Sequence, residues 1–89
     1  MFQVEWLQSV LDHLTDVWIA SDSITREALT AAVAEIDRRL TADPHSSGES
    51  RDPNIRVDFV YPISYTFHVP ADSHVVTVVK IRVYRRRSH

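Results

Sequence analysis

The first half of the chain carries apolar residues at the spacing of a helix. Two runs, residues 6–18 and 23–43, repeat an apolar side chain every three or four positions, so each predicts a helix with one buried face. These positions are Trp6, Leu7, Val10, Leu11, Leu14, Val17 and Trp18 in the first run and Leu29, Ala32, Val33, Ile36 and Leu40 in the second. The capping segment SDS separates the runs, and Pro44 ends the second. The short break predicts an antiparallel helical hairpin.

The second half of the chain changes to the alternation of β-strands. Residues 55–60, 63–69 and 74–84 alternate or are rich in β-branched side chains, and the breaks YP and PADS separate them. Residues 43–54 contain the only glycine and two of the four prolines without any periodicity, so they predict a loop. The opening segment MFQV alternates and predicts a short strand.

These segments predict one α+β domain that spans residues 1–89. An N-terminal strand and an antiparallel helical hairpin are expected to pack on a small twisted antiparallel sheet. A chain of 89 residues is too short to bury a second core of useful size. We therefore expect a single domain.

Alternation along the three predicted strands also sorts their side chains between two faces. We expect the apolar face to pack on the helices, with Ile55, Val57, Phe59, Ile63, Tyr65, Phe67, Val69, Val75, Thr77, Val79, Ile81 and Val83. The opposite face would then collect Arg56, Ser64, Thr66, His68, Lys80, Arg82 and Tyr84. The sequence thus predicts a polar and mostly cationic sheet face.

Composition narrows the chemistry available to this domain. No cysteine is present, which excludes disulfides and thiolate zinc sites, and the five histidines lack metal-ligand spacing. One glycine cannot form a phosphate-binding loop, so we expect neither metal nor cofactor. The N-terminus lacks the basic start of a secretory signal, and acidic residues interrupt every apolar run long before the ~18 residues of a membrane span. We expect a cytoplasmic location and no membrane partner.

Charge divides along the chain although the net charge is only -2. Residues 1–47 hold three arginines and eight acidic side chains, whereas residues 48–89 hold seven basic and four acidic ones. The helices are therefore expected to be acidic, and the sheet and C-terminal tail basic. Such an asymmetry would steer a polyanion or an acidic peptide to one side of the molecule.

The order of elements and three short segments carry a family pattern. The segments are EIDRRLTADP, GESR, and RVDFVYPISYTFHVPADSHVVTVVKIRVYRRR. In this order they resemble the RelE/ParE toxin superfamily of bacterial type II toxin–antitoxin systems, over nearly the whole chain. The resemblance implies a growth-inhibiting toxin that a cognate antitoxin neutralises by wrapping the sheet and helices. In that superfamily one branch cleaves mRNA on the ribosome, and another poisons DNA gyrase without acting as a nuclease.

Membership of the nuclease branch would imply roles for particular side chains. A metal-independent endoribonuclease must activate a ribose 2′-hydroxyl, stabilise a phosphorane and protonate the leaving oxygen. Arg56, Lys80 and Arg82 would stabilise the phosphorane. Glu49 or His68 could act as base.

The resemblance assigns the remaining site residues to substrate contact. Tyr84 could stack on a base or serve as the acid, and Arg51 would hold the RNA backbone from the loop. The predicted RNA-binding residues are Arg51, Arg85, Arg86 and Arg87.

One departure from the nuclease pattern keeps the target open. Nucleases of the superfamily usually carry an arginine on the second sheet strand, where this chain has Ser64. We slightly favour ribosome-associated mRNA cleavage at this point. The alternatives are a non-catalytic toxin that acts on DNA gyrase and an inactive module that only binds antitoxin.

Overall fold

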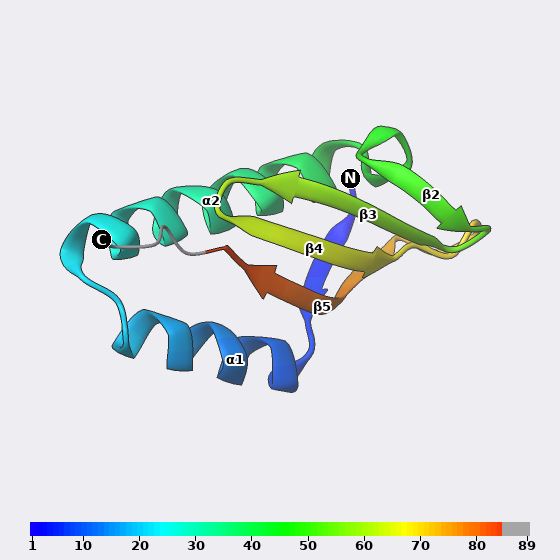
Figure 1. Cartoon of the computed structure of the whole chain (residues 1–89). Coiled ribbons are helices and arrows are strands. Elements are labelled where there is room, and N and C mark those ends of the chain that lie inside the picture. Colours follow the sequence, from blue (N-terminus) through cyan, green and yellow to red (C-terminus); the bar gives the residue numbers. More distant parts are fainter. Residues whose placement is uncertain (85–89) are drawn as a thin grey trace.

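The computed structural model describes residues 1–84 and places two helices on one face of a five-stranded sheet (Figure 1). The elements are β1 (Gln3–Trp6), α1 (Gln8–Ile19), α2 (Ser23–Ala42), the 3-10 helix η1 (Pro44–Ser46), β2 (Glu49–Asp52), β3 (Ile55–Val60), β4 (Ile63–His68) and β5 (Val75–Val83). The sheet order is β1-β5-β4-β3-β2. Within residues 1–84, β1 and β5 pair in parallel, and the other neighbouring strands of the sheet pair antiparallel.

The predicted α+β fold class is confirmed, and three details of the predicted elements are wrong. The segment predicted as a loop contains η1 and β2, and β2 forms one edge of the sheet. The first strand pairs parallel to β5, so the sheet is mixed rather than antiparallel. Trp6 belongs to this strand and not to the first helix, and its indole Nε1 donates a hydrogen bond to Asp37 of α2 at 2.9 Å.

Both helix boundaries of α2 follow from local chemistry. The Asp22 carboxylate accepts a hydrogen bond from the Thr25 backbone N–H at 2.8 Å, which satisfies one of the free donors at the helix N-terminus. At the other end the helix stops at Ala42, two residues before Pro44. None of the helices in residues 1–84 combines the length and the apolar character needed to cross a membrane.

The core lies between the helices and the central strand β4. Ile63, Tyr65 and Phe67 of β4 are all fully buried. They belong to one apolar cluster with Leu29 and Ile36 of α2 and with residues of α1 and β5. Their alternation places Ser64, Thr66 and His68 on the other side of the sheet, as predicted.

The structure reverses the predicted orientation of β3. Asp58 pairs with Tyr65 and Arg56 pairs with Phe67, and residues that pair directly across two strands share a face. Arg56 and Asp58 therefore lie on the helix side, whereas Ile55, Val57 and Phe59 lie on the side away from the helices. The prediction was wrong because each strand was assigned by its own apolar residues and not by its register with β4.

A β-bulge divides β5 into two halves. The predicted side-chain orientations are wrong before the bulge and correct after it. Phe67 pairs with Val78 and Thr66 pairs with Lys80, so Val79 is an extra residue without a partner on β4. Before the bulge the core side chains are Val76 and Val78, both fully buried, rather than the predicted Val75, Thr77 and Val79. After the bulge, the predicted orientations of Ile81 and Lys80 hold. The bulge thus changes which alternate residues face the core.

A polar network joins α2 to the sheet on the helix side. Arg39 Nη1 and the Tyr65 hydroxyl both donate to Asp58 Oδ2, each at 3.1 Å. Arg39 also binds Glu35, and hydrogen bonds from Arg38 and then Arg39 lower the pKa of Glu35 to about 2. Burial, followed by the negative charge of Asp58, raises the pKa of Tyr65 well above its usual range. Asp58 therefore accepts two hydrogen bonds that tie α2, β3 and β4 together.

Replacement of Gly48 should destabilise the turn that leads into β2. Gly48 has φ of 66°, and a Cβ atom there would overlap the carbonyl oxygen of Val57. Gly48→Ala should lower the free energy of unfolding by about 1–3 kcal/mol in urea denaturation, because left-handed backbone and the overlap both cost energy. Ser46→Ala, at an exposed neighbour, should change it by less than about 0.5 kcal/mol. Equal stability of the two variants would contradict this account of the turn.

Titration of Tyr65 should weaken the fold at alkaline pH. The folded-state pKa is raised, so the stabilisation is complete below the unfolded value of ~10 and is lost progressively as pH rises above it. Urea midpoints measured between pH 8 and 11 should fall for the wild-type chain and fall less for Tyr65→Phe. Parallel pH profiles for the two proteins would show that Tyr65 ionises freely in the folded state.

Candidate functional site

The side of the sheet away from the helices, called the open face here, has side chains arranged in rows across the strands. One row contains Phe59 of β3, Ser64 of β4 and Arg82 of β5. The next row contains Val57, Thr66 and Lys80. A neutral residue of β4 therefore lies directly beside each of these two cations of β5, and an apolar residue of β3 follows in the same row.

Lys80, Arg82 and Tyr84 are exposed on the C-terminal half of β5 and just beyond it. The Arg82 guanidinium lies over the Tyr84 ring, with Cζ 5.5 Å from the ring centroid. Within residues 1–84, no carboxylate forms an ion pair with Lys80 or Arg82. The open face thus presents two cations whose charges are not neutralised by the described part of the chain.

The two proposed bases differ in their distance from these cations. Glu49 of β2 shares a row with Lys80 but is three strands away, which separates their backbones by about 14 Å. His68 lies on the open face two residues along β4 from Thr66, the partner of Lys80, so it is a diagonal neighbour of Lys80 at about 8 Å between backbones. It is four residues from Ser64, the partner of Arg82, which separates it from Arg82 by about 13 Å along the strands. Glu49 is therefore far from both cations, and His68 is near Lys80 but far from Arg82, so the predicted catalytic residues do not all converge on one point.

Arg56 does not lie on the open face, and its predicted placement beside Lys80 and Arg82 is wrong. Its Nε donates to the Ser47 carbonyl at 2.8 Å, and its Nη2 donates to the Gly48 carbonyl at 2.9 Å. The guanidinium thus closes the loop before β2. It is positioned to stabilise the fold and not to contact a ligand on the open face.

Arg51, the residue predicted to bind RNA that lies within residues 1–84, falls outside the central part of the open face. Arg51 is exposed on the edge strand β2, where its guanidinium lies 3.8 Å from the Glu49 carboxylate. Both side chains are largely exposed, so this pair contributes little to stability. Arg85, Arg86 and Arg87 lie outside the described residues.

Sequence reasoning missed two aromatic residues of the open face. Phe59 was predicted in the core but is 48% exposed, and Tyr61 in the β3–β4 turn is 61% exposed. A register signal was available, because the two-residue connection at Tyr61 and Pro62 places Val60 opposite Ile63. Since Ile63 is a core residue, this register sends Val60 inward and Phe59 outward.

The helix side also exposes apolar surface. Leu11 and Trp18 of α1 are 39% and 38% exposed, although both were predicted on the buried stripe. An apolar cavity of about 240 Å³ lies between the two helices and is lined by Leu14, Trp18, Leu29, Thr30 and Val33. The first helix is thus less completely covered than its periodicity suggested.

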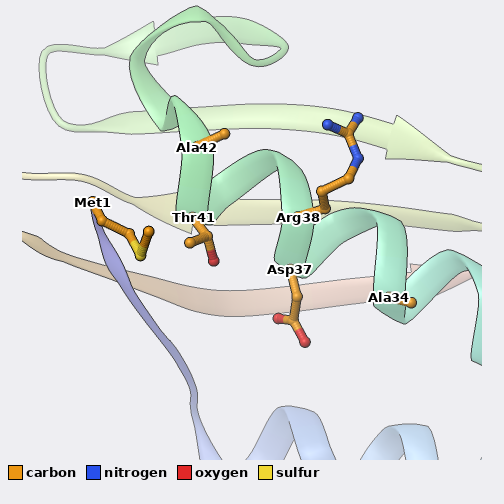
Figure 2. Close-up of a pocket in the computed structure, with 6 residues that line it drawn as sticks. All are labelled: Met1, Ala34, Asp37, Arg38, Thr41 and Ala42. Carbon is orange, nitrogen blue, oxygen red and sulfur yellow. The ribbon is translucent and has the colours of Figure 1, made fainter.

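A shallow hollow of about 550 Å³ lies between the N-terminus and α2, and Figure 2 shows the residues that line it. Asp37 and Arg38 point in different directions from α2 (Figure 2). Asp37 already accepts the Trp6 indole hydrogen, and Arg38 binds Glu35. The hollow therefore offers no converging polar groups. Within the described chain, no three His, Asp or Glu side chains gather where they could hold a metal ion.

Comparison with solved structures identifies the fold. A chain of the chromosomal ParDE toxin–antitoxin (TA) system from P. aeruginosa superimposes with a TM-score of 0.65, covering 96% of this chain and 98% of the other. This chain has a ParE-like fold. The likeness holds at 18% sequence identity, so it is a likeness of fold. No protein-family model and no curated protein matched the sequence.

The ParE-like fold confirms the structural part of the resemblance seen in the sequence. The coverage of both chains is nearly complete, so the superposition includes the sheet and both helices. The site residues predicted from the resemblance stay predictions, because a shared fold does not transfer side-chain roles.

Alanine substitutions of basic residues on the two faces of the sheet should differ in their effect on stability. Arg56→Ala removes two hydrogen bonds that close a loop and should lower the free energy of unfolding by about 1–2 kcal/mol. Lys80→Ala and Arg82→Ala, which truncate exposed side chains, should change it by no more than about 0.5 kcal/mol. Urea denaturation of the three variants would measure the difference. A larger loss for Arg82→Ala than for Arg56→Ala would contradict the assignment of faces.

Proposed function

We propose that this chain is the toxin of a type II toxin–antitoxin system and that it inhibits growth by binding a target rather than by cleaving one. A ParE-like action on DNA gyrase is the form of this proposal that we favour. The observation that supports it most is the ParE-like fold, which extends over the whole ParDE chain. The activity of that system is carried over to this chain as a proposal.

The arrangement of the open face favours binding over catalysis. General acid–base catalysis requires groups within hydrogen-bond reach of one reacting centre. Lys80 and Arg82 have neutral Thr66 and Ser64 as their partners on β4, and Glu49 lies three strands away from Lys80. His68 is a diagonal neighbour of Lys80 but lies about 13 Å along the strands from the row of Arg82. Exposed cations on a rigid strand suit recognition of an acidic surface.

Neutralisation by an antitoxin would use surface that the chain leaves uncovered. The apolar cavity between α1 and α2, together with exposed Leu11 and Trp18, is the kind of surface that a partner chain covers. The basic side of the sheet would attract acidic residues of the same partner. An antitoxin that contacts both surfaces would block target binding directly.

Ribosome-associated mRNA cleavage is the second candidate. One observation favours it, because Lys80, Arg82 and Tyr84 share the open face and could contact a phosphate and a base together. Ser64 argues against it, since it stands where the nuclease pattern has an arginine. The two candidates predict that different processes stop first in the cell: DNA synthesis for action on gyrase, and protein synthesis for mRNA cleavage.

Induced expression of the chain in a bacterial host should test the proposal. Growth should stop, and incorporation of labelled DNA precursor should fall before incorporation of labelled amino acid. Charge reversal by Lys80→Glu with Arg82→Glu should restore growth at equal protein level, because the cations that contact the target are lost. Arg51→Glu, which reverses an exposed charge at the far edge of the sheet, is the matched control and should stay toxic.

Three outcomes would contradict parts of the proposal. Early loss of protein synthesis with cleaved mRNA would favour the nuclease. Toxicity that survives reversal of both cations would move the target contact away from the open face. Unchanged growth on expression of the wild-type chain would overturn the toxin role. In the expected case, co-expression of the product of an adjacent small reading frame should restore growth.

A further inference from the structure

The side of α2 that points away from the sheet carries a regular line of side chains, called the outer seam here. Its members recur at alternating steps of three and four residues, so they lie in one line along the helix. Five of them are exposed and Thr41 is half-buried. They are Ile24, Glu27, Ala31, Ala34, Arg38 and Thr41. The buried residues of α2 lie on the opposite side of the helix, so the outer seam makes no contact with the core.

The outer seam is self-complementary when two copies of α2 lie antiparallel. A twofold axis between Ala31 and Ala34 places each of these alanines opposite the other one in the second copy. The next step outward places Glu27 opposite Arg38, and the last places Ile24 opposite Thr41. The same three matches occur a second time by symmetry, as a twofold dimer requires.

The charged match uses groups that are free to form it. Glu27 is exposed and forms no ion pair within residues 1–84. Arg38 binds Glu35 through Nε at 2.8 Å and Nη2 at 2.7 Å, so the two hydrogens of Nη1 can bind a second carboxylate. A Glu27 carboxylate from a second copy would therefore reach Arg38 without displacing Glu35.

The apolar match joins a projecting side chain to a hollow. Ile24 is 76% exposed in the first turn of α2. The hollow of about 550 Å³ lies at the other end of the helix, where Met1, Thr41 and Ala42 contribute to its lining (Figure 2). Ile24 of an antiparallel copy would lie opposite Thr41, at the edge of this hollow. Each copy thus supplies one projecting side chain and one hollow.

The centre of the outer seam permits close approach. Ala31 and Ala34 are both exposed and carry only a Cβ methyl group. Small side chains at a helix contact bring the two axes to about 8 Å, the lower end of the usual range. At that separation the charged and apolar matches on either side of the alanines come within contact distance.

We propose that the outer seam of α2 is the interface of an antiparallel homodimer of this chain. It shares no residue with the lining of the apolar cavity between α1 and α2. Both open faces stay uncovered, because they lie on the side of the sheet away from the helices. The dimer goes beyond the proposed toxin action and does not depend on it, so its test uses the purified full chain and no growth assay.

Sedimentation velocity over about 1–200 µM protein would measure the association. We expect the mass to rise with concentration from 10.2 kDa towards twice that value. A contact made by one helix pair lies at the small end of the range for specific interfaces, so the dissociation constant should be micromolar.

Exchange of the two charges tests the antiparallel register. Glu27→Arg places like charges opposite Arg38 and should weaken dimerisation at least about tenfold. Glu27→Arg combined with Arg38→Glu restores opposite charges in both matches and should recover most of the affinity. Asp72→Arg makes the same charge change at an exposed turn before β5 and should leave the dissociation constant unchanged.

A second substitution tests the apolar match. Ile24→Ser removes the projecting side chain and should weaken dimerisation about tenfold, since its burial in the hollow is lost. Phe59→Thr removes an exposed apolar side chain from the open face and is the matched control. It should have no effect on dimerisation.

Disulfide trapping reports the register without charge reversal. The chain contains no cysteine, so introduced thiols react only with each other. Positions 27 and 38 are about 16 Å apart along one helix, too far for a bond within one chain. Under mild oxidation, Glu27→Cys combined with Arg38→Cys should give covalent dimers, whereas either single variant should give few.

Three results would overturn the inference. They are a monomer at every concentration, a dimer that folded Glu27→Arg and Ile24→Ser leave intact, and equal disulfide trapping of the single and double cysteine variants. The last result would indicate a parallel or random contact. A toxic monomer would refute the interface alone, and a dimer without toxicity would refute the toxin role alone.

Discussion

Burial of the central strand under α2 is the constraint on which the rest of the structure depends. Ile63, Tyr65 and Phe67 are fully buried together, so the orientation of β4 allows no alternative. Pairing then transmits this orientation to β3 on one side and to β5 on the other, because directly paired residues share a face. The open face therefore consists of Ser64, Thr66 and His68 together with the residues of β3 and β5 that pair with them.

This constraint explains why charged residues of β3 and β5 behave differently. Asp58 pairs with buried Tyr65 and is enclosed on the helix side, where Arg39 and the Tyr65 hydroxyl satisfy its carboxylate. Lys80 and Arg82 pair with Thr66 and Ser64 and stay in water. Asp58 is therefore paired with a cation of α2, whereas within residues 1–84 the cations of β5 form no ion pair with a carboxylate.

The ParE-like fold at 18% identity shows how loosely such a scaffold specifies its surface. Packing under α2 requires apolar residues at alternate positions of β4 but places no demand on the side chains of the open face. Rings at Phe59, Tyr61 and Tyr84 are therefore not explained by the core. Their exposure to water contributes no stability to the fold.

The sequence by itself determined the types of the two α-helices and of β1, β3, β4 and β5, the boundaries of α2, the α+β class and the inward side chains of β4, because hydrophobic periodicity and capping are local properties. It did not predict η1 and β2, which lie in a segment without periodicity. It also placed Lys80, Arg82 and Tyr84 on the exposed side. Only the tertiary structure decided the orientation of β3 and of the first half of β5. Phe59 and Arg56 exchanged their expected faces because register with β4 outweighs the apolar character of one strand. The bulge at Val79 then shifted the alternation of β5, since an unpaired residue is visible only when two strands lie side by side.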